Sequence, residues 1–505
     1  MIHQQIPIVC ALPKPERKVS LSQYIGTFGF VVVMLCLQVV WETRLCSASY
    51  CFFTSCTFTL SVHSDFFNAP QLRCFFSSLS CRIRLILIKE KIILYHTTTK
   101  LTPFMKAFDS ETFRLQFPAL RQSTVFLDSA ATALKPACMT AATEHYYQNH
   151  SATVHRSQHA TAQAMTARYE QARTLVSELI HAPLPEDIVW TKGATESINL
   201  VAQSYFRSRL NVGDEIIVSE QEHHSNLLPW LILAQQTGAK IVKWPIDAQR
   251  KLDLNVLATL LNEKSRLIAI SHMSNVTGAS VDLAQVTKLA HQYHCRVLVD
   301  GAQGIVHSPI DVQQSDIDFY AFSAHKLYGP NGVGVLYGKT EYLNAMSPWH
   351  GGGKMLTQVS FDGFTPEAVP YRFEAGTPNV AGIIGFAATL EWLKETDIRL
   401  AESHAIALTD YAEQQLSTLP GFISYRVAGS SLLAFNIAGI HHSDLATLIA
   451  EQNISLRSGQ HCAQPLMDAL GISGCLRASF MPYNNQQDAD RLVSAVKLAL
   501  SLLDG

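Results

Sequence analysis

Lys326 has the setting that a covalent role in catalysis needs. It lies in the stretch Ser323 to Pro330 (SAHKLYGP), just after an apolar run, with a hydroxyl and an imidazole group beside it. A lysine held at the edge of a sheet and screened from water can form a Schiff base with an aldehyde cofactor. Taken alone, the same lysine is equally consistent with a surface loop.

Asp300 adds a carboxylate at the end of another apolar run, RVLVD, and Gly-Ala-Gln303 follows it. Pyridoxal phosphate requires an anion beside its ring nitrogen, because the protonated ring is the electron sink of its chemistry. A strand-end aspartate standing alone is more often a helix N-cap. Lys326 and Asp300 together are therefore stronger evidence for a pyridoxal phosphate site than either residue alone.

Two further strand-to-helix junctions carry polar groups. Gly193 to Ser197 (GATES) follows the run IVWT, so that backbone N–H groups near Ala194 and the hydroxyl of Thr195 can cradle a phosphate. His223 stands at a second junction, EHHSN, where an imidazole can lie flat on a cofactor ring. Adjacent histidines can also suggest zinc, but no third ligand has matching spacing, so no metal site is expected.

A cysteine and an arginine near the C-terminus complete the candidate chemistry. Cys462 lies in a short polar loop, RSGQHCAQP, which favours a partly exposed, activatable thiol over a buried one. Arg477 lies inside the apolar run CLRASF, where a guanidinium is tolerated mainly when it binds a carboxylate.

The elements that must position these residues alternate between apolar strands and amphipathic helices, which predicts a mostly parallel sheet covered on both faces. The helix expected over Asp282 to Tyr293 is an example. The expected strands are Ile188 to Thr191, Glu215 to Ser219, Lys240 to Trp244, Arg266 to His272, Arg296 to Asp300, Phe319 to Ser323 and Gly334 to Tyr337.

Beyond about Glu395 the order of elements changes and predicts a smaller α+β domain. We expect helices at Leu400 to Thr418, Ser443 to Glu451 and Gln487 to Leu503, and strands at Ser431 to Ile437, Ser455 to Arg457 and Leu476 to Ser479. The expected division is a large domain over residues 119–395 and a small one over 105–118 and 396–505. A cleft between two such domains is a usual place for a ligand.

The first 104 residues differ from the rest of the 505-residue chain. They hold ten basic and four acidic residues, a net +6, whereas the remainder holds 29 basic and 37 acidic residues, a net −8. They show no recognisable domain, and residues 24–41 form an apolar run of about the minimum length for a membrane span. We favour a misplaced start codon, with translation beginning at Met105, over a membrane anchor or targeting segment.

Composition bounds the partners and the compartment. A net charge of −2 gives no bulk attraction to nucleic acid, so no nucleic-acid partner is expected. From Met105 onward only four cysteines occur, without paired spacing, which favours a reducing, cytoplasmic location.

From about Phe108 to the C-terminus, the sequence resembles the group II cysteine desulfurases, which are class V, fold type I pyridoxal phosphate enzymes. It is most similar to the bacterial cysteine sulfinate desulfinase branch. The resemblance rests on motifs that occur in order along the chain: LDSAATALKP, HRSQHA, TKGATESINLV, EHHSNLLPW, SNVTGA, DGAQ, SAHKLYGP, FEAGTPN, RSGQHCAQP and LRASF. It implies the α/β fold of that class, with a large seven-stranded, mostly parallel sheet and a small C-terminal α+β domain.

The resemblance also implies a role for each matching residue. Lys326 would bind the cofactor covalently, Asp300 would pair with its ring nitrogen, His223 would stack on the ring, and Gln303 and Asn275 would bond its phenolic oxygen. The phosphate would be bound at Ala194, Thr195, Ser323 and His325, together with Thr377 from a partner subunit, which implies a homodimer. The substrate carboxylate would be bound by Arg477, with Arg457 and Arg156 as further cleft residues.

The implied reaction removes sulfur, selenium or sulfite from L-cysteine, L-selenocysteine or L-cysteine sulfinate and releases L-alanine. Cys462 would carry a persulfide and pass it to an acceptor protein of the SufE type. One departure concerns the loop before this cysteine, which reads Gln460-His461 where many group II members carry two histidines.

Two other functions remain open from the sequence. Another class V enzyme, such as a kynureninase or an aminotransferase, would share Lys326 and Asp300 but would not use Cys462. A non-catalytic sulfur-relay scaffold would normally have lost one of these three residues, and all three are present.

Overall fold

The computed structural model describes residues 108–503 and, before them, only five strands. These are β1 (Val9–Cys10), β2 (Val19–Ser20), β3 (Ser55–Thr57), β4 (Arg82–Ile88) and β5 (Lys91–Thr97), paired in the order β2-β1-β5-β4-β3. The chain divides into two compact units, Met1–Ala107 and Phe108–Gly505. The apolar run 24–41 lies outside the described residues, and within them no helix is long and apolar enough to cross a membrane. The misplaced start and the division near residue 395 remain predictions.

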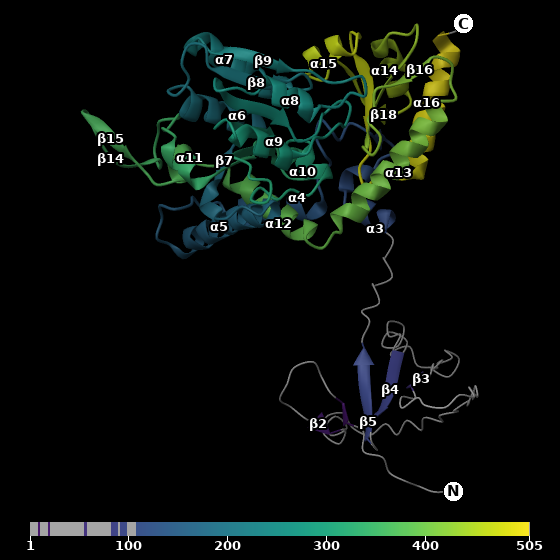
Figure 1. The fold of residues 1–505 in the computed structure, drawn as a ribbon, viewed down its shortest axis with the longest axis horizontal. Coiled ribbons are helices and arrows are strands. Elements are labelled where there is room, and N and C mark those ends of the chain that lie inside the picture. Colours follow the sequence, from purple (N-terminus) through teal and green to yellow (C-terminus); the bar gives the residue numbers. More distant parts are fainter. Residues whose placement is uncertain are drawn as a thin grey trace, which may run out of the picture. The chain divides into compact units, whose positions relative to one another are not determined.

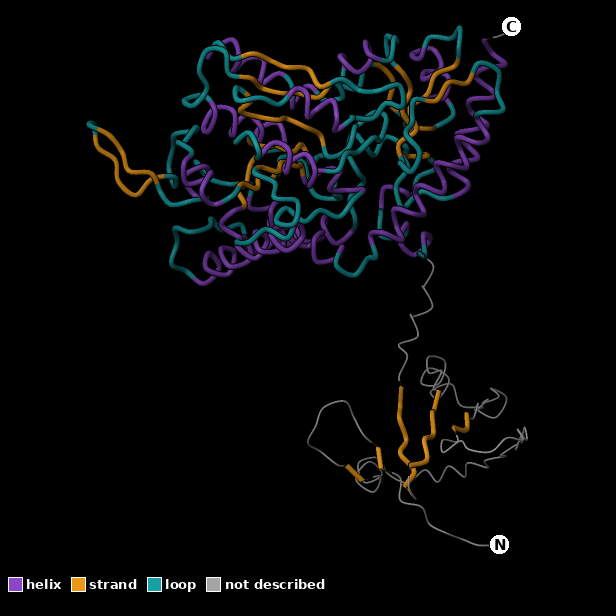
Figure 2. The backbone as a smooth tube through the Cα atoms, viewed as in Figure 1, coloured by secondary structure: helices purple, strands orange, loops and turns teal. Residues whose placement is uncertain are grey.

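A seven-stranded sheet forms the centre of the second unit (Figures 1 and 2). Its strands are β7 (Ile188–Thr191), β8 (Glu215–Ser219), β9 (Lys240–Trp244), β10 (Ser265–Ser271), β11 (Arg296–Asp300), β12 (Phe319–Ser323) and β13 (Gly334–Gly338). They pair in the order β7-β13-β12-β11-β10-β8-β9, and β13 alone runs in the direction opposite to the other six. The predicted mostly parallel sheet is confirmed, with strand bounds within one residue of those expected.

Both faces of this sheet are buried, and alternate residues of each strand belong to different cores. In β11, Val297 and Val299 pack into one apolar cluster, while Leu298 packs into the other. This follows from the two-residue period of a strand, and it explains why the strands read as continuous apolar runs.

Helices cover the two faces (Figure 1). Those of the larger cluster include α5 (Ala160–Ile180), α9 (Leu283–His291) and α12 (Val380–Leu393), and those of the opposite face include α6 (Ala194–Val201), α7 (Leu228–Thr237) and α11 (Thr340–Ala345). Shorter helices are α3 (Ser110–Arg114), α4 (Ala137–His145), α8 (Leu254–Leu260) and α10 (Gly304–His307). Side-chain caps fix several starts; Asp282, for example, accepts a hydrogen bond from the Gln285 backbone N–H at 3.1 Å before α9.

A second, four-stranded sheet lies in the C-terminal part. Its order is β16-β17-β20-β19, formed by β16 (Phe422–Ser424), β17 (Leu432–Ile437), β19 (Arg457–Gly459) and β20 (Cys475–Ser479). Helices α13 (Ile398–Leu416), α14 (His442–Glu451) and α16 (Gln486–Leu503) pack on it, and α15 (Gln464–Ala469) follows β19. The predicted α+β arrangement is confirmed.

The single strand expected over Ser455 to Arg457 is wrong. The chain forms two strands there: β18 (Ile454–Ser455) pairs with β6 (Val125–Phe126), whereas β19 pairs with β20. The chain passes from one sheet to the other at Leu456, and a local sequence pattern does not indicate which strand a segment pairs with.

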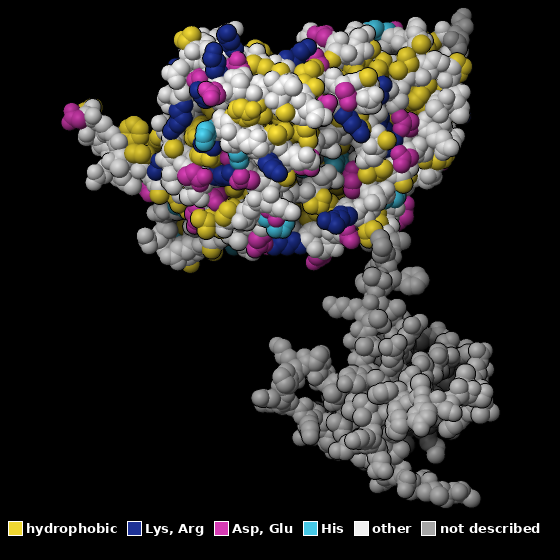
Figure 3. Space-filling view, in the orientation of Figure 1, with side chains coloured by type: hydrophobic (Ala, Val, Ile, Leu, Met, Phe, Trp, Pro, Cys, Tyr) yellow, Lys and Arg dark blue, Asp and Glu magenta, His cyan; other side chains and the backbone are white. Residues whose placement is uncertain are grey.

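A projecting hairpin, β14 (Leu356–Ser360) and β15 (Gly363–Pro366), was not predicted. It extends from the side of the unit (Figure 1), and hydrophobic side chains are visible on it in the space-filling view (Figure 3). Its exposed apolar residues include Val359, Phe361 and Phe364. Apolar and polar residues alternate only weakly along its strands, because both faces of the hairpin are exposed in the single chain.

A charged cluster fixes the last turn of α9. The two ring nitrogens of His291 lie 3.0 Å from Asp316 and 2.9 Å from the fully buried Asp318, and Lys339 contacts both carboxylates. The hydrogen bond with Asp318 raises the pKa of His291 above 6.5. A cation at this place also complements the dipole at the C-terminal end of the helix.

The stability of the protein should therefore depend on the protonation of His291. Because its folded pKa is raised, the stabilisation is complete below about pH 6.5 and is lost as the pH rises through the folded pKa. His291→Gln should remove this slope from the free energy of unfolding, measured with urea at several pH values. The matched control is His145→Gln in α4, an exposed histidine that contacts Asn149 rather than a carboxylate; an unchanged slope in His291→Gln would contradict the assignment.

Candidate active site

The carboxyl ends of the parallel strands meet at one cavity. Asp300 ends β11, Ser323 ends β12 and Ser271 ends β10, and all three line it. Eleven of the fourteen predicted site residues line this cavity: Ala194, Thr195, His223, Asn275, Asp300, Gln303, Ser323, His325, Lys326, Arg457 and Arg477. The topology thus brings together residues that are almost 300 positions apart in the sequence.

Lys326 projects from a single 3₁₀ turn (Ala324–Lys326) directly after β12. Burial lowers the pKa of its amine to about 8, the charge of Asp300 opposes this, and the charges of Arg477 and Arg457 lower it further. A lysine with this pKa is partly neutral near physiological pH, so its amine can act as a nucleophile or as a base.

Asp300 is buried at the bottom of the cavity. Its Oδ1 accepts a hydrogen bond from the Ala302 backbone N–H at 2.9 Å. Burial raises the pKa of Asp300, while this bond and the charge of Lys326 oppose the shift. A cationic ligand atom would therefore favour the ionised carboxylate.

Two aromatic rings fix the loop that carries Asp300 and Gln303. A Cβ atom on Gly301 would lie 2.1 Å from the Tyr320 ring, and one on Gly304 would lie 2.1 Å from the His272 ring. The two rings bond each other, with His272 Nδ1 3.0 Å from Tyr320 Oη. Only glycine fits at these two positions, so the loop lies flat against the pair.

Hydroxyl groups gather around the start of α6. The Ala194 backbone N–H donates to Ser323 Oγ at 2.8 Å, and Thr195 Oγ1 lies 2.7 Å from Ser225 Oγ. Burial and the charges of Lys326 and Lys135 lower the pKa of His325 to about 4, so its ring is neutral. Hydroxyls at a helix N-terminus suit an anion such as a phosphate. Ser225 was not predicted as a site residue, although it lies in the motif EHHSN.

His223 also has a neutral ring. Burial, followed by the charges of Lys326 and His224, lowers its pKa to about 3. Its Nδ1 accepts a hydrogen bond from the Ser225 backbone N–H at 3.1 Å, which fixes the tautomer with the proton on Nε2.

Arg477 is buried in β20. Its NH1 donates to the Asn275 carbonyl oxygen at 2.8 Å, and its NH2 lies 3.3 Å from Asp128 Oδ1. Its Nε is buried and has no partner within the described residues. Burial lowers its pKa to about 10, so the guanidinium stays charged at neutral pH. Asp128, which sequence reasoning missed, lies in the motif LDSAATALKP.

Cys462 lies beside the cavity and does not line it. Arg457, which does line it, brings its NH2 to 3.8 Å from Cys462 Sγ. The half-buried thiol is one of four free cysteines in the described residues. The guanidinium is therefore the group that connects the sulfur with the cavity.

The loop of Cys462 is held from both sheets. Its carbonyl oxygen accepts from the His224 backbone N–H at 2.7 Å, and the Gln464 N–H donates to His224 Nε2 at 3.2 Å. Asn275 Nδ2 donates to the His461 carbonyl oxygen at 2.8 Å. His461 and Cys462 both adopt left-handed backbone angles, with φ of 53° and 57°. The buried His461 ring lies 2.9 Å from the Cys475 carbonyl oxygen.

Two predicted residues lie away from this cavity in the single chain. Thr377 is exposed in a separate groove beside Trp349, and Arg156 is exposed near Gly353. For Thr377 this is compatible with a role in a second subunit, and both assignments remain predictions.

Comparison with known proteins places this site in a family. Residues 125–492 match the model of the aminotransferase class-V family. The chain belongs to that family. It is similar to the cysteine desulfurase CsdA of Escherichia coli, with 59% identity over 399 residues, which cover 79% of this chain and all of the relative.

Solved structures agree with the family assignment. The crystal structure of Escherichia coli CsdA has a TM-score of 0.75 and covers 78% of this chain and 99% of its own. The apo cysteine desulfurase of Thermococcus onnurineus, at 34% identity, has a TM-score of 0.73 and covers 77% of this chain and 98% of its own. The family and the fold class inferred from the sequence are thus confirmed.

Gly301→Ala tests the fixed loop. The added methyl group must displace Tyr320 or move Asp300, which should cost about 1–3 kcal/mol of stability and weaken binding of pyridoxal phosphate. Urea unfolding and equilibrium dialysis measure the two effects. Gly351→Ala is the matched control, since a Cβ there meets nothing within 4 Å; equal behaviour of the two variants would refute the constraint.

Proposed function

We propose that this chain is a pyridoxal phosphate-dependent cysteine desulfurase that converts L-cysteine to L-alanine and passes the sulfur to an acceptor. The observation that carries the proposal is the cavity in which Lys326 lies near Asp300 and Arg477, with Arg457 joining it to the thiol of Cys462. The family membership and the relatives named as cysteine desulfurases support it.

The donor set of the cavity fits the cofactor. A buried carboxylate, an amine and several hydroxyls line one space, and the neutral rings of His223 and His325 add no competing charge. When bound, pyridoxal phosphate supplies an electron sink for negative charge at the substrate α-carbon. Asp300, His223, Gln303 and Asn275 would hold its ring.

The phosphate would be held by the residues at the start of α6 and at the end of β12. These are Ala194, Thr195, Ser323 and His325. Gln303 and Asn275 each already donate one amide hydrogen to a backbone carbonyl, of Ala130 and His461 respectively, and each keeps a second one for the ring oxygen.

Arg477 would bind the substrate carboxylate. Its Nε is a buried donor that has no partner in the described part of the chain, which is costly unless a ligand acceptor satisfies it. Its two other nitrogens are fixed by Asn275 and Asp128, so the guanidinium is oriented before the substrate arrives.

Lys326 would move the proton. With a pKa of about 8, its Nζ can take the proton from the substrate α-carbon and later return one to the product. Cys462, as a thiolate, attacks the substrate sulfur; the new S–S bond forms as the Cβ–S bond breaks, and the carbon keeps that electron pair. Protonation of the carbon gives alanine, and the sulfur remains on Cys462 as a persulfide.

The finer parts of the proposal concern substrates and partners. Cysteine sulfinate and selenocysteine would also react, with sulfite leaving without attack by Cys462. The loop of Cys462 is short and held at both sides, so a SufE-type acceptor would dock at the cavity to take the sulfur. The enzyme would work in the cytoplasm as a homodimer in which Thr377 completes the phosphate site of the other subunit.

Two variants separate the roles of lysine and cysteine. Lys326→Ala should lower alanine release from both cysteine and cysteine sulfinate by at least about a thousandfold, because it removes the proton-transfer group. Cys462→Ala should abolish persulfide formation from cysteine yet keep most of the sulfinate reaction. Alanine is quantified for each substrate, with and without a candidate acceptor protein. Equal loss of both activities in Cys462→Ala would refute the division of roles.

Arg457 should control the reactivity of the thiol. The guanidinium NH2 contacts the sulfur at 3.8 Å and holds it in place, so Arg457→Met should slow alkylation of Cys462 by iodoacetamide, while Arg457→Lys should retain part of the rate. Mass spectrometry reports each cysteine, and Cys138 in the same molecule is the internal control. An unchanged rate at Cys462 would exclude this role.

A further inference from the structure

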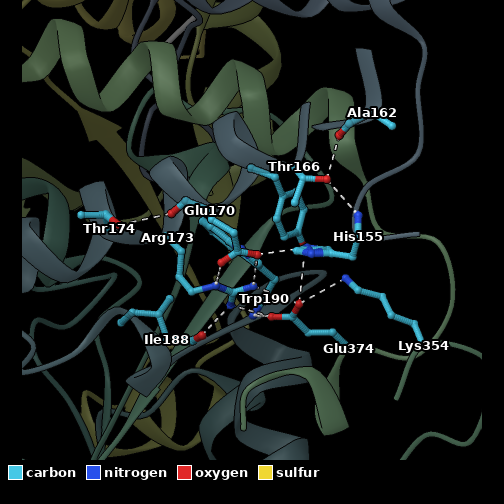
Figure 4. A network of polar contacts seen from close by, with 11 residues as sticks. His155, Ala162, Thr166, Glu170, Arg173, Thr174, Ile188, Trp190, Lys354 and Glu374 are labelled. Carbon is cyan, nitrogen blue, oxygen red and sulfur yellow. Dashed lines mark hydrogen bonds and ion pairs between the residues drawn. The ribbon is translucent and has the colours of Figure 1, made fainter. Parts of the chain in front are cut away.

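A buried charge network is centred on Arg173 and Glu374 (Figure 4). None of its residues lines the cavity, and Glu374 precedes Thr377 by three residues. Arg173 in α5 donates to both carboxylate oxygens of Glu374, at 2.7 and 3.1 Å, and both side chains are almost fully buried. Arg173 also donates to the Ile188 carbonyl oxygen at 2.7 Å, and Glu374 accepts from the Trp190 N–H at 3.0 Å. The pair therefore binds Glu374 to both α5 and β7.

Other charges extend the network to two further loops. Glu170 lies 2.8 Å from Arg173 Nε and 3.0 Å from His155 Nε2. The buried Lys354 ammonium lies 3.8 Å from Glu374, has no hydrogen-bond partner among the described residues, and lies 5.2 Å from the centre of the Tyr169 ring. The segment at 155 thus contacts Glu170, and the segment at 354 contacts Glu374, so Arg173 links both segments through these two carboxylates (Figure 4).

The charges keep Glu374 ionised. Burial alone would raise its pKa, but the charge and hydrogen bonds of Arg173, the charge of Lys354 and the bond from Trp190 hold it below its ordinary value. Buried ion pairs often add little net stability compared with apolar packing, so a network of this size calls for another explanation, such as fixing one backbone arrangement.

The backbone that this network fixes leads to Thr377. Glu374 precedes Thr377 by three residues, and the intervening Gly376, at φ 85°, donates its N–H to the Gly353 carbonyl oxygen at 2.8 Å. Lys354, next to Gly353, has φ 79°. Two tight bends are therefore joined by one backbone bond. The first carries Lys354, whose ammonium lies 3.8 Å from Glu374, and the second follows Glu374 by two residues.

We propose that Arg173 and Glu374 are positioning residues that hold the segment 374–377 in the shape in which Thr377 reaches the cofactor phosphate of a second copy of this chain. The inference rests on the proposed function, in which Thr377 makes that contact. It assigns a role to a charged pair that does not line the cavity.

A double-mutant cycle on the holoenzyme tests this role. The dissociation constant for pyridoxal phosphate is measured by equilibrium dialysis for the wild type, Glu374→Gln, Thr377→Val and the double variant. Each single variant should raise it about tenfold, and the double variant should also stay near tenfold, whereas independent effects would multiply to about a hundredfold. Independent effects, or no effect of Glu374→Gln, would overturn the inference.

A matched control separates positioning from general stability. Glu413→Gln removes a carboxylate from the buried Arg426 in the C-terminal part, away from the network. It should lower the melting temperature without changing the cofactor dissociation constant; an equal rise in that constant would overturn the inference. If Glu374→Gln does not fold, Lys354→Met replaces it, since Lys354 has no hydrogen bond to lose within residues 108–503, and it should raise the constant about threefold through the same segment.

The outcome also distinguishes this inference from the proposed function. If the wild type binds pyridoxal phosphate and releases alanine from cysteine, but Glu374→Gln leaves the cofactor dissociation constant unchanged, the inference is wrong and the proposed function stands. A wild type that binds no pyridoxal phosphate would remove both. A silent Thr377→Val would remove the contact between subunits and, with it, the inference.

Discussion

Positive charge exceeds negative charge around the cavity, and the rest of the site is arranged around that imbalance. Lys326, Arg457 and Arg477 face the carboxylates of Asp300 and Asp128, while the rings of His223, His325 and His461 stay neutral because their pKa values fall to between about 3 and 4. Crowded cations in a partly dry space repel one another, which is one reason why the pKa of Lys326 falls. An anionic ligand relieves that repulsion, so the site favours a phosphate and a carboxylate before any specific contact is considered.

The cavity depends on both sheets at once. The large sheet supplies the strand ends with Asp300 and Ser323, and the small sheet supplies Arg457 and Arg477 from β19 and β20. The His224 backbone N–H and the Asn275 side-chain amide, both from the unit of the large sheet, then donate to carbonyl oxygens in the loop of Cys462. A change in the packing of one sheet on the other would therefore alter the distance between the sulfur and the amine.

Much of this arrangement can be predicted from the sequence, because strand ends and buried runs are local signals. All seven strands of the large sheet, and the motifs around Lys326, Asp300 and Thr195, follow from apolar runs and the residues that end them. The motifs in order also identify the family. Which strands and which charged side chains pair with each other is harder to predict, since this is decided by contacts between residues that are distant in sequence. The change of sheet at Leu456 and the pairing of Arg477 with Asp128 depend on residues more than 300 positions apart, and no local pattern reports them.

The left-handed backbone at Cys462 has a consequence for how the protein can evolve. A residue with a side chain is strained there by roughly 1 kcal/mol or more, and glycine would relieve that strain. Selection for thermal stability alone would thus favour glycine at position 462, whereas selection for turnover would retain the cysteine. Cys462 therefore provides its thiol at a cost in stability that a glycine at the same position would not have.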